Sequence, residues 1–121
     1  MVTFEQLRYR PLQATRAPVY LDFHHAEPGM VAIFGDNGSG KSTLAQLMAG
    51  WYPDYLPGAI EGQGTLLGIP VGELSLVERA PTIQLVQQSP YLQLSGCTFS
   101  VEEEVAFGPE NLCLEDAEIL Q

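Results

Sequence analysis

Lys41, the only lysine of this chain, lies in a glycine-rich run that ends in two hydroxyl residues. The run is Gly35-Asp36-Asn37-Gly38-Ser39-Gly40-Lys41-Ser42-Thr43, which fits the spacing G-x-x-x-x-G-K-[ST] of a phosphate-binding P-loop. A polyphosphate carries several negative charges, and it is best met by backbone N–H groups that no side chain shields. The spacing therefore predicts a site for the phosphates of a nucleoside triphosphate at residues 35–43.

The glycines and the loop's position before a helix explain how the anion would be bound. Gly38 and Gly40 permit backbone conformations that other residues resist, and Gly35 provides the exit from a preceding strand. The amides of residues 40–43 are expected to begin a helix, where unpaired N–H groups and the helix dipole favour negative charge.

Three side chains then have separate expected tasks. Lys41 should reach the β- and γ-phosphates, the Ser42 hydroxyl should ligate Mg²⁺, and Thr43 should contact the region of the α-phosphate. The elements that must position them are also predicted by the pattern. Residues 30–34 are an apolar run typical of a buried strand, and residues 42–49 carry apolar side chains at helical spacing.

The rest of the chain alternates short predicted elements with turn residues. Strands are expected at 2–9, ended by Pro11, at 19–23, as an antiparallel pair within 60–68, and at 82–87. A short helix is expected at 74–79. A longer one should begin after Ser100, with Glu103 completing a capping box, and end at Gly108-Pro109, and another should span 115–120.

The glutamate run 102–104 has two interpretations. Three neighbouring carboxylates could form a catalytic or metal-binding cluster, but their position in the first turn of a helix favours a capping role. His24 and His25 are adjacent, so in a strand they face opposite sides and suit a surface pair better than a metal site. Cys97 and Cys113 have no metal-ligand spacing and are expected to be free thiols of a reducing compartment.

The net charge of −10 is unevenly distributed over the chain. Residues 1–43 hold four acids and four bases, whereas the remainder holds eleven acids and a single base, Arg79. Phosphate backbones require clustered lysine and arginine, so nucleic acid is excluded as the main partner. No apolar run is long enough to cross a bilayer, and a soluble chain is expected.

Together the loop, its helix and the stretch Val86-Gln87-Gln88-Ser89-Pro90 resemble the N-terminal half of an ABC-transporter ATPase domain. The resemblance implies an α/β fold with a P-loop NTPase core and an N-terminal antiparallel β-portion over residues 1–121. It implies ATP and Mg²⁺ as cofactors, bound by Gly35, Asn37, Gly38, Ser39, Gly40, Lys41, Ser42 and Thr43.

Residues 86–93 correspond to the Q-loop of that family, in which a glutamine ends a strand and a proline follows two residues later. This places Gln88 in contact with Mg²⁺ and the attacking water, with Gln87 and Gln84 as neighbouring alternatives. Lys41 and Gln88 are thus the catalytic candidates. The family also stacks adenine on an aromatic residue about two dozen positions before the loop, near Pro11, so Tyr9 is the candidate here.

The string Val105-Ala106-Phe107-Gly108-Pro109-Glu110-Asn111-Leu112 is similar to ATPases of energy-coupling-factor transporters, which import cobalt, nickel or vitamins. This resemblance implies a second ABC ATPase domain as partner, in a homo- or heterodimer, and a transmembrane coupling subunit. It also implies a cytoplasmic location at the inner face of the cell membrane. The transported substrate belongs to the membrane components and is not predicted.

Three family features are expected beyond residue 121: the Leu-Ser-Gly-Gly-Gln motif, the Walker B carboxylates and the switch histidine. Two alternatives therefore stay open. One is a truncated module that binds nucleotide without hydrolysing it, since phosphoryl transfer also needs a positioned water and a carboxylate. The other is an unrelated P-loop kinase or GTPase, which the Q-loop and 105–112 strings disfavour.

Overall fold

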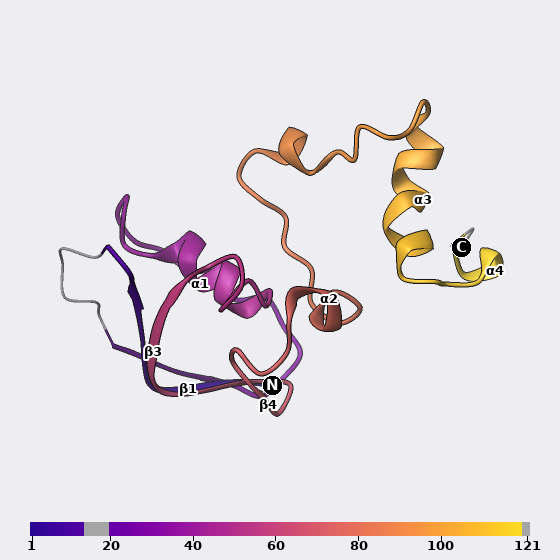
Figure 1. Ribbon diagram of the computed structural model, residues 1–121. Coiled ribbons are helices and arrows are strands. Elements are labelled where there is room, and N and C mark those ends of the chain that lie inside the picture. The colour runs from indigo at the N-terminus through magenta and orange to yellow at the C-terminus, as the bar shows by residue number, and fades with distance from the viewer. Residues whose placement is uncertain (14–19, 120–121) are drawn as a thin grey trace. The chain divides into compact units, whose positions relative to one another are not determined.

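The computed structural model describes residues 1–13 and 20–119, which divide into two compact units, 1–85 and 86–121. The first unit holds an antiparallel sheet with a helix packed on it, and the second holds short helices (Figure 1). This mixed composition confirms the predicted α/β class and its N-terminal antiparallel portion.

The sheet has four strands in the order β2-β1-β3-β4. They are β1 (Val2–Pro11), β2 (Leu21–His25), β3 (Gly58–Leu66) and β4 (Ile69–Pro70). Strand β1 pairs antiparallel with both β2 and β3 and so forms the middle of the sheet. The predicted strand 2–9 is confirmed. The strand predicted at 19–23 is displaced to 21–25, and its first residue, Val19, lies outside the described residues.

The antiparallel pair expected within 60–68 takes a different form. Most of that segment is one strand, β3, whose long partner is β1. Leu67 and Gly68, with φ of 54° and 84°, then make the two-residue turn into β4, which pairs Leu66 with Ile69.

The core of the first unit lies between this sheet and the helix α1 (Lys41–Met48). Phe4, Leu7 and Leu66 are buried to at least 97%, and Leu44 and Met48 of α1 pack against them. The helix predicted at 42–49 is thereby confirmed, because its apolar spacing is what contacts the sheet.

Two predicted strands are wrong. Residues 30–34 and 82–87 have no strand structure, and Met30 and Phe34 are 98% and 89% exposed. A strand buried in a parallel sheet needs hydrogen-bonded neighbours and cover on both faces. All four strands in the described part of the chain belong to the antiparallel sheet, which pairs with neither segment.

Short helices complete the chain: α2 (Leu76–Arg79), a 3₁₀ turn (Pro90–Gln93), α3 (Val101–Asn111) and α4 (Asp116–Ile119). Helix α3 continues past the predicted stop at Gly108-Pro109. The Asn111 side chain donates to the Phe107 carbonyl at 2.6 Å, and the Leu112 N–H donates to Gly108 at 3.1 Å. With these hydrogen bonds the helix continues beyond Pro109, which has no backbone N–H to donate. The expected end of α4, Leu120, lies outside the described residues.

Candidate functional site

The loop at 35–43 is a tight turn whose shape depends on glycine. The Ser39 N–H donates to the Asp36 carbonyl at 3.1 Å, and φ is 79° at Gly38 and 96° at Gly40. A Cβ would meet no atom within 4 Å at either glycine, so only the left-handed backbone requires glycine there. At Gly35 a Cβ would lie 2.7 Å from the Ser39 Oγ, so the Ser39 side chain would have to move to admit it.

Helix α1 starts without any of the usual caps. Its N-cap is Gly40, which has no side chain, and the first turn contains no acidic residue. The first hydrogen bond of the helix runs from the Leu44 N–H to the Gly40 carbonyl at 2.8 Å. The N–H groups of residues 41–43 therefore precede the regular hydrogen bonds of the helix. A helix start of this kind presents N–H groups and a positive dipole end to an anion.

The Lys41 ammonium lies over the same loop. Its Nζ donates to the Gly35 carbonyl at 2.7 Å and the Asp36 carbonyl at 2.8 Å, and lies 3.4 Å from the Ser39 Oγ. These partners are neutral oxygens, so the charge of Lys41 is solvated by the loop without being neutralised by a carboxylate. An anionic ligand can therefore compete for it.

The remaining loop residues surround the same helix start. Ser42 and Asn37 are exposed and Thr43 is half-buried. The donor set fits a Mg²⁺-bound triphosphate: backbone amides and one ammonium for phosphate oxygens, and a hydroxyl oxygen, the ligand type that Mg²⁺ accepts.

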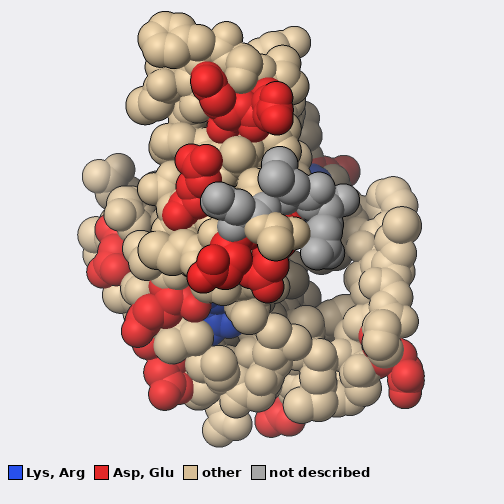
Figure 2. Space-filling model, turned by 90° about the vertical axis from the view of Figure 1, so that its right-hand side faces the viewer, with Lys and Arg blue, Asp and Glu red and all other residues tan. Residues whose placement is uncertain are grey.

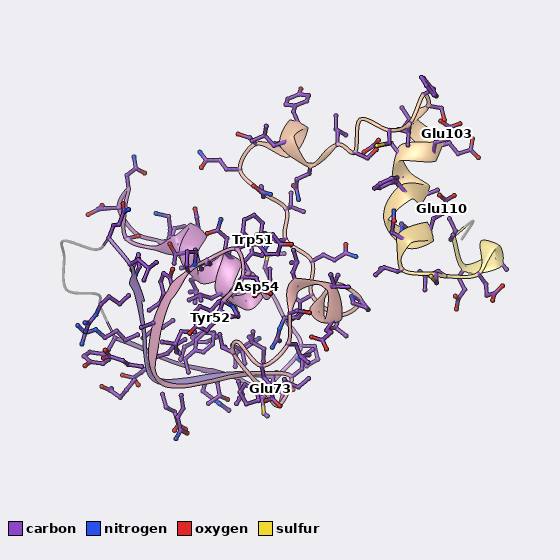
Figure 3. The ribbon with its side chains drawn as sticks, viewed as in Figure 1. Trp51, Tyr52, Asp54, Glu73, Glu103 and Glu110 are labelled. Atoms are coloured by element: carbon purple, nitrogen blue, oxygen red, sulfur yellow. The ribbon has the colours of Figure 1, made fainter. Side chains whose placement is uncertain are left out.

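Tyr9 lies on β1 in the same unit as the loop, but its ring is already in contact with protein. Its hydroxyl donates to the Pro57 carbonyl at 2.9 Å, and its ring meets the edge of Tyr52 with centroids 6.3 Å apart. Burial raises the pKa of Tyr9, and the neighbouring Tyr52 raises it further. Tyr52, labelled in Figure 3, comes from the segment that follows α1. Because Tyr9 and Tyr52 lie far apart in the sequence, no sequence pattern predicts the contact between their rings.

Gln88 belongs to the second unit, where it is exposed and precedes the 3₁₀ turn at Pro90–Gln93. The Gln87 N–H donates to the Gln93 Oε1 at 2.8 Å, which closes the backbone around Gln88. Gln84, the other alternative, is exposed at the end of the first unit.

The glutamate run serves helix α3. The Glu103 carboxylate accepts from the Ser100 N–H at 3.2 Å, and the Ser100 Oγ accepts from the Glu103 N–H at 3.2 Å, so the predicted capping box is confirmed. The Glu104 carboxylate instead accepts from Ser95 and Thr98. Within the described residues, no group of three or more histidine, cysteine or acidic residues could hold a metal ion.

The two histidines and the distribution of charge on the surface can be compared with the sequence prediction. His24 and His25 point to opposite faces of β2, as expected: His24 is exposed, and His25 is half-buried with its ring stacked on Phe23. Figure 2 shows acidic side chains spread over one face of the molecule with little positive charge among them. The one base after Thr43, Arg79, is 98% buried.

The loop and the fold together define an α/β protein with a glycine-rich loop of P-loop spacing at the start of its first helix. The family model described as ABC transporter matches residues 19–116. The chain belongs to this family.

Individual relatives are similar over most of the chain. A "Putative ABC transporter ATP-binding protein" of Methanosarcina mazei is 38% identical over 98% of this chain, and another of Enterococcus faecalis is 40% identical over 74% of it. The "Energy-coupling factor transporter ATP-binding protein EcfA" of Methanosarcina acetivorans is 35% identical over 98%. The chain spans 41%, 15% and 41% of these three proteins, respectively. No solved structure gives a significant match.

Proposed function

We propose that this chain binds ATP with Mg²⁺ on residues 35–43 and forms the N-terminal part, 1–121, of the nucleotide-binding domain of an ABC-transporter ATPase. The observation that carries the proposal is the uncapped start of α1, where the glycine loop and the Lys41 ammonium meet. Membership of the ABC transporter family supports it.

In this proposal the loop backbone surrounds the phosphates. The residues that provide it are Gly35, Asn37, Gly38, Ser39 and Gly40. Lys41 leaves the Gly35 and Asp36 carbonyls for the β- and γ-phosphate oxygens, while Thr43 contacts the α-phosphate region. The Ser42 hydroxyl is a ligand for Mg²⁺, which would neutralise phosphate charge when bound. Gln88 supplies a second contact to the metal and the attacking water, and Tyr9 offers a ring to adenine.

The whole protein is proposed to hydrolyse ATP and so power the import of a metal ion or vitamin. The string at residues 105–112 supports an importer of the energy-coupling-factor type, as does the similarity to EcfA. The proposed partners are a second ABC ATPase domain and a transmembrane coupling subunit. In the described part of the chain, no helix is both long and apolar enough to cross a membrane. The proposed coupling subunit would hold the ATPase in a peripheral position on the inner face of the membrane.

Equilibrium binding of a fluorescent ATP analogue with Mg²⁺, displaced by unlabelled ATP, tests the phosphate site. Lys41→Ala removes a charged hydrogen bond worth about 1.5–3 kcal/mol, so we expect ATP affinity to fall about 10- to 100-fold. Arg10→Ala is the matched control: it removes one positive charge from β1, where Arg10 forms an exposed pair with Glu61 of β3, and should leave affinity within about two-fold. Equal affinities of wild type and Lys41→Ala would refute the proposed function.

A further inference from the structure

Strand β1 changes register in the middle of its length. Its pairing with β2 is irregular between Phe4 and Leu7, and its pairing with β3 is irregular between Glu5 and Arg8. Gln6 lies at this bulge with φ of 50°. Strict alternation would bury every second residue, yet Phe4 and Leu7 are both buried although they are three residues apart. The bulge therefore inverts the facing of every later residue of the strand.

Among these later residues, Arg8 and Tyr9 show the effect of the inversion. Tyr9 pairs with Ile60, which packs against the core, and so faces the side of the sheet on which α1 lies. Arg8 faces the other side, where it lies 3.4 Å from Glu61 and its guanidinium covers the ring of Tyr20. Without the inserted residue, Arg8 would face α1 and Tyr9 would face away from it.

The bulge is held by one carboxylate and one glycine. The Asp22 Oδ1 accepts from the Gln6 backbone N–H at 2.7 Å, and its Oδ2 accepts from the Gln6 Nε2 at 2.6 Å. On the opposite strand Gly62 has φ of 81°, and a Cβ there would lie 2.0 Å from the Gln6 carbonyl oxygen. Asp22 thus satisfies the bulged backbone, and Gly62 leaves it the space it needs.

We propose that Asp22 is a positioning residue for the base of the nucleotide: by holding the bulge at Gln6, it makes Tyr9 face the helix that carries the phosphate loop. This inference rests on the proposed function. The ligand it serves is the purine base of a nucleoside triphosphate, bound by stacking on the Tyr9 ring. Asp22 touches neither base nor phosphate and acts only through the strand.

Affinities for ATP and for inorganic tripolyphosphate, measured with Mg²⁺ on the same purified variants, test this proposal. The affinity for tripolyphosphate depends on the loop alone, whereas the affinity for ATP also depends on the contacts that the protein makes with the base. Stacking on an aromatic ring is worth about 1–3 kcal/mol per base, so Tyr9→Ala should weaken ATP binding about ten-fold and leave tripolyphosphate unchanged. We expect Asp22→Ala to do the same, because Tyr9 is then no longer held in place.

Three variants separate positioning from general loss of structure. Asp22→Asn keeps an oxygen acceptor for the Gln6 N–H and should restore most of the ATP affinity. Gln6→Gly keeps the bulge, since glycine adopts positive φ freely, and should behave as wild type. Gly62→Ala forces the bulge to move and should reproduce Asp22→Ala, so the test survives if one of the two fails to fold.

A spectroscopic signal follows Tyr9 directly. Titration of 3-fluorotyrosine by ¹⁹F NMR, with Tyr9→Phe to assign the signal, should show the raised Tyr9 pKa falling toward its ordinary value in Asp22→Ala. The proposal would be overturned if Asp22→Ala left the ratio of ATP to tripolyphosphate affinity unchanged, whether both affinities stayed at the wild-type value or both fell equally. An unchanged ratio in Tyr9→Ala would overturn it too. If Lys41→Ala still loses both ligands in that case, the proposed phosphate site stands.

Discussion

Three consecutive glutamates show how much a single residue's role depends on its partners. Glu103 caps α3, whereas Glu104 accepts hydrogen bonds from the Thr98 hydroxyl at 2.6 Å and from the Ser95 hydroxyl at 2.7 Å. The Thr98 hydroxyl, followed by the backbone and side chain of Ser95, holds the pKa of Glu104 below its ordinary value. Glu102 makes no side-chain hydrogen bond to the described part of the chain, so one run of carboxylates contains three separate environments.

The Glu104 contacts should make the loop at 95–98 sensitive to acid. Because the folded pKa is depressed, the stabilisation is complete above the ordinary glutamate pKa and is lost as pH falls through the folded value. The protection factor of the Ser95 amide, which compares its exchange rate with that of an unstructured peptide at the same pH, should therefore fall as the solution is acidified below the ordinary glutamate pKa. Glu104→Gln should show fast exchange already at neutral pH, while Glu102→Gln should follow wild type. A protection factor at Ser95 that stays at the wild-type value in Glu104→Gln would contradict this role.

At the scale of elements, the helix starts differ in a way that separates structure from function. Helices α2 and α3 begin with capping boxes built on Ser75 and Ser100, each completed by a glutamate three residues later. Helix α1 begins with Gly40 and has neither device. A cap at Ser75 or Ser100 stabilises its helix, whereas the start of α1 has no side-chain cap for its N–H donors, in agreement with the proposed phosphate site.

Ser100→Ala should therefore destabilise α3. Loss of an N-cap hydroxyl costs about 1 kcal/mol, so amide exchange in the first turn of α3 should become about five-fold faster. Ser89→Ala is the matched control, since Ser89 precedes the 3₁₀ turn but makes no side-chain cap hydrogen bond. Identical protection of α3 in the Ser100→Ala and Ser89→Ala variants would show that the capping box contributes nothing.

For the molecule as a whole, the fully buried residues in the described part of the chain all lie in one unit. The core of Phe4, Leu7 and Leu66 lies within residues 1–85, whereas none of the described residues from 86 to 119 is fully buried. Packing against a hydrophobic core is the main source of folding free energy, so the first unit should determine the stability of the chain. Trp51, the only tryptophan, lies in this unit and reports on it.

Leu66→Ala tests that conclusion. The Leu66 side chain is 1% exposed, and truncating a fully buried leucine costs about 2–5 kcal/mol. Urea unfolding followed by Trp51 fluorescence should show a clearly lower midpoint for this variant. Leu92→Ala, at a position 79% exposed in the second unit, should change the free energy of unfolding by less than about 0.5 kcal/mol. A midpoint for Leu66→Ala equal to that of Leu92→Ala would disprove the assignment of the core.

Features whose causes lie within a few residues of the chain could be predicted from the amino-acid sequence. The glycine loop, the start of α1 and the capping box of α3 were all predictable, since positive φ and cap hydrogen bonds are set by neighbouring residue types. The first strand followed from its apolar pattern in the same way, whereas the α/β class was implied by the resemblance to ABC-transporter ATPases.

Features that depend on residues far apart in the sequence could be seen only in the folded chain. Residues 30–34 have strand-forming side chains but no hydrogen-bonded neighbour in the described sheet, so propensity alone could not make a strand of them. Arg79 is buried against the Pro70 carbonyl, and Tyr9 faces α1 because Asp22, thirteen positions further along the chain, holds a bulge at Gln6. One extra residue in a strand reverses every side chain after it, and it is the pairing with a second strand that decides where this residue is inserted.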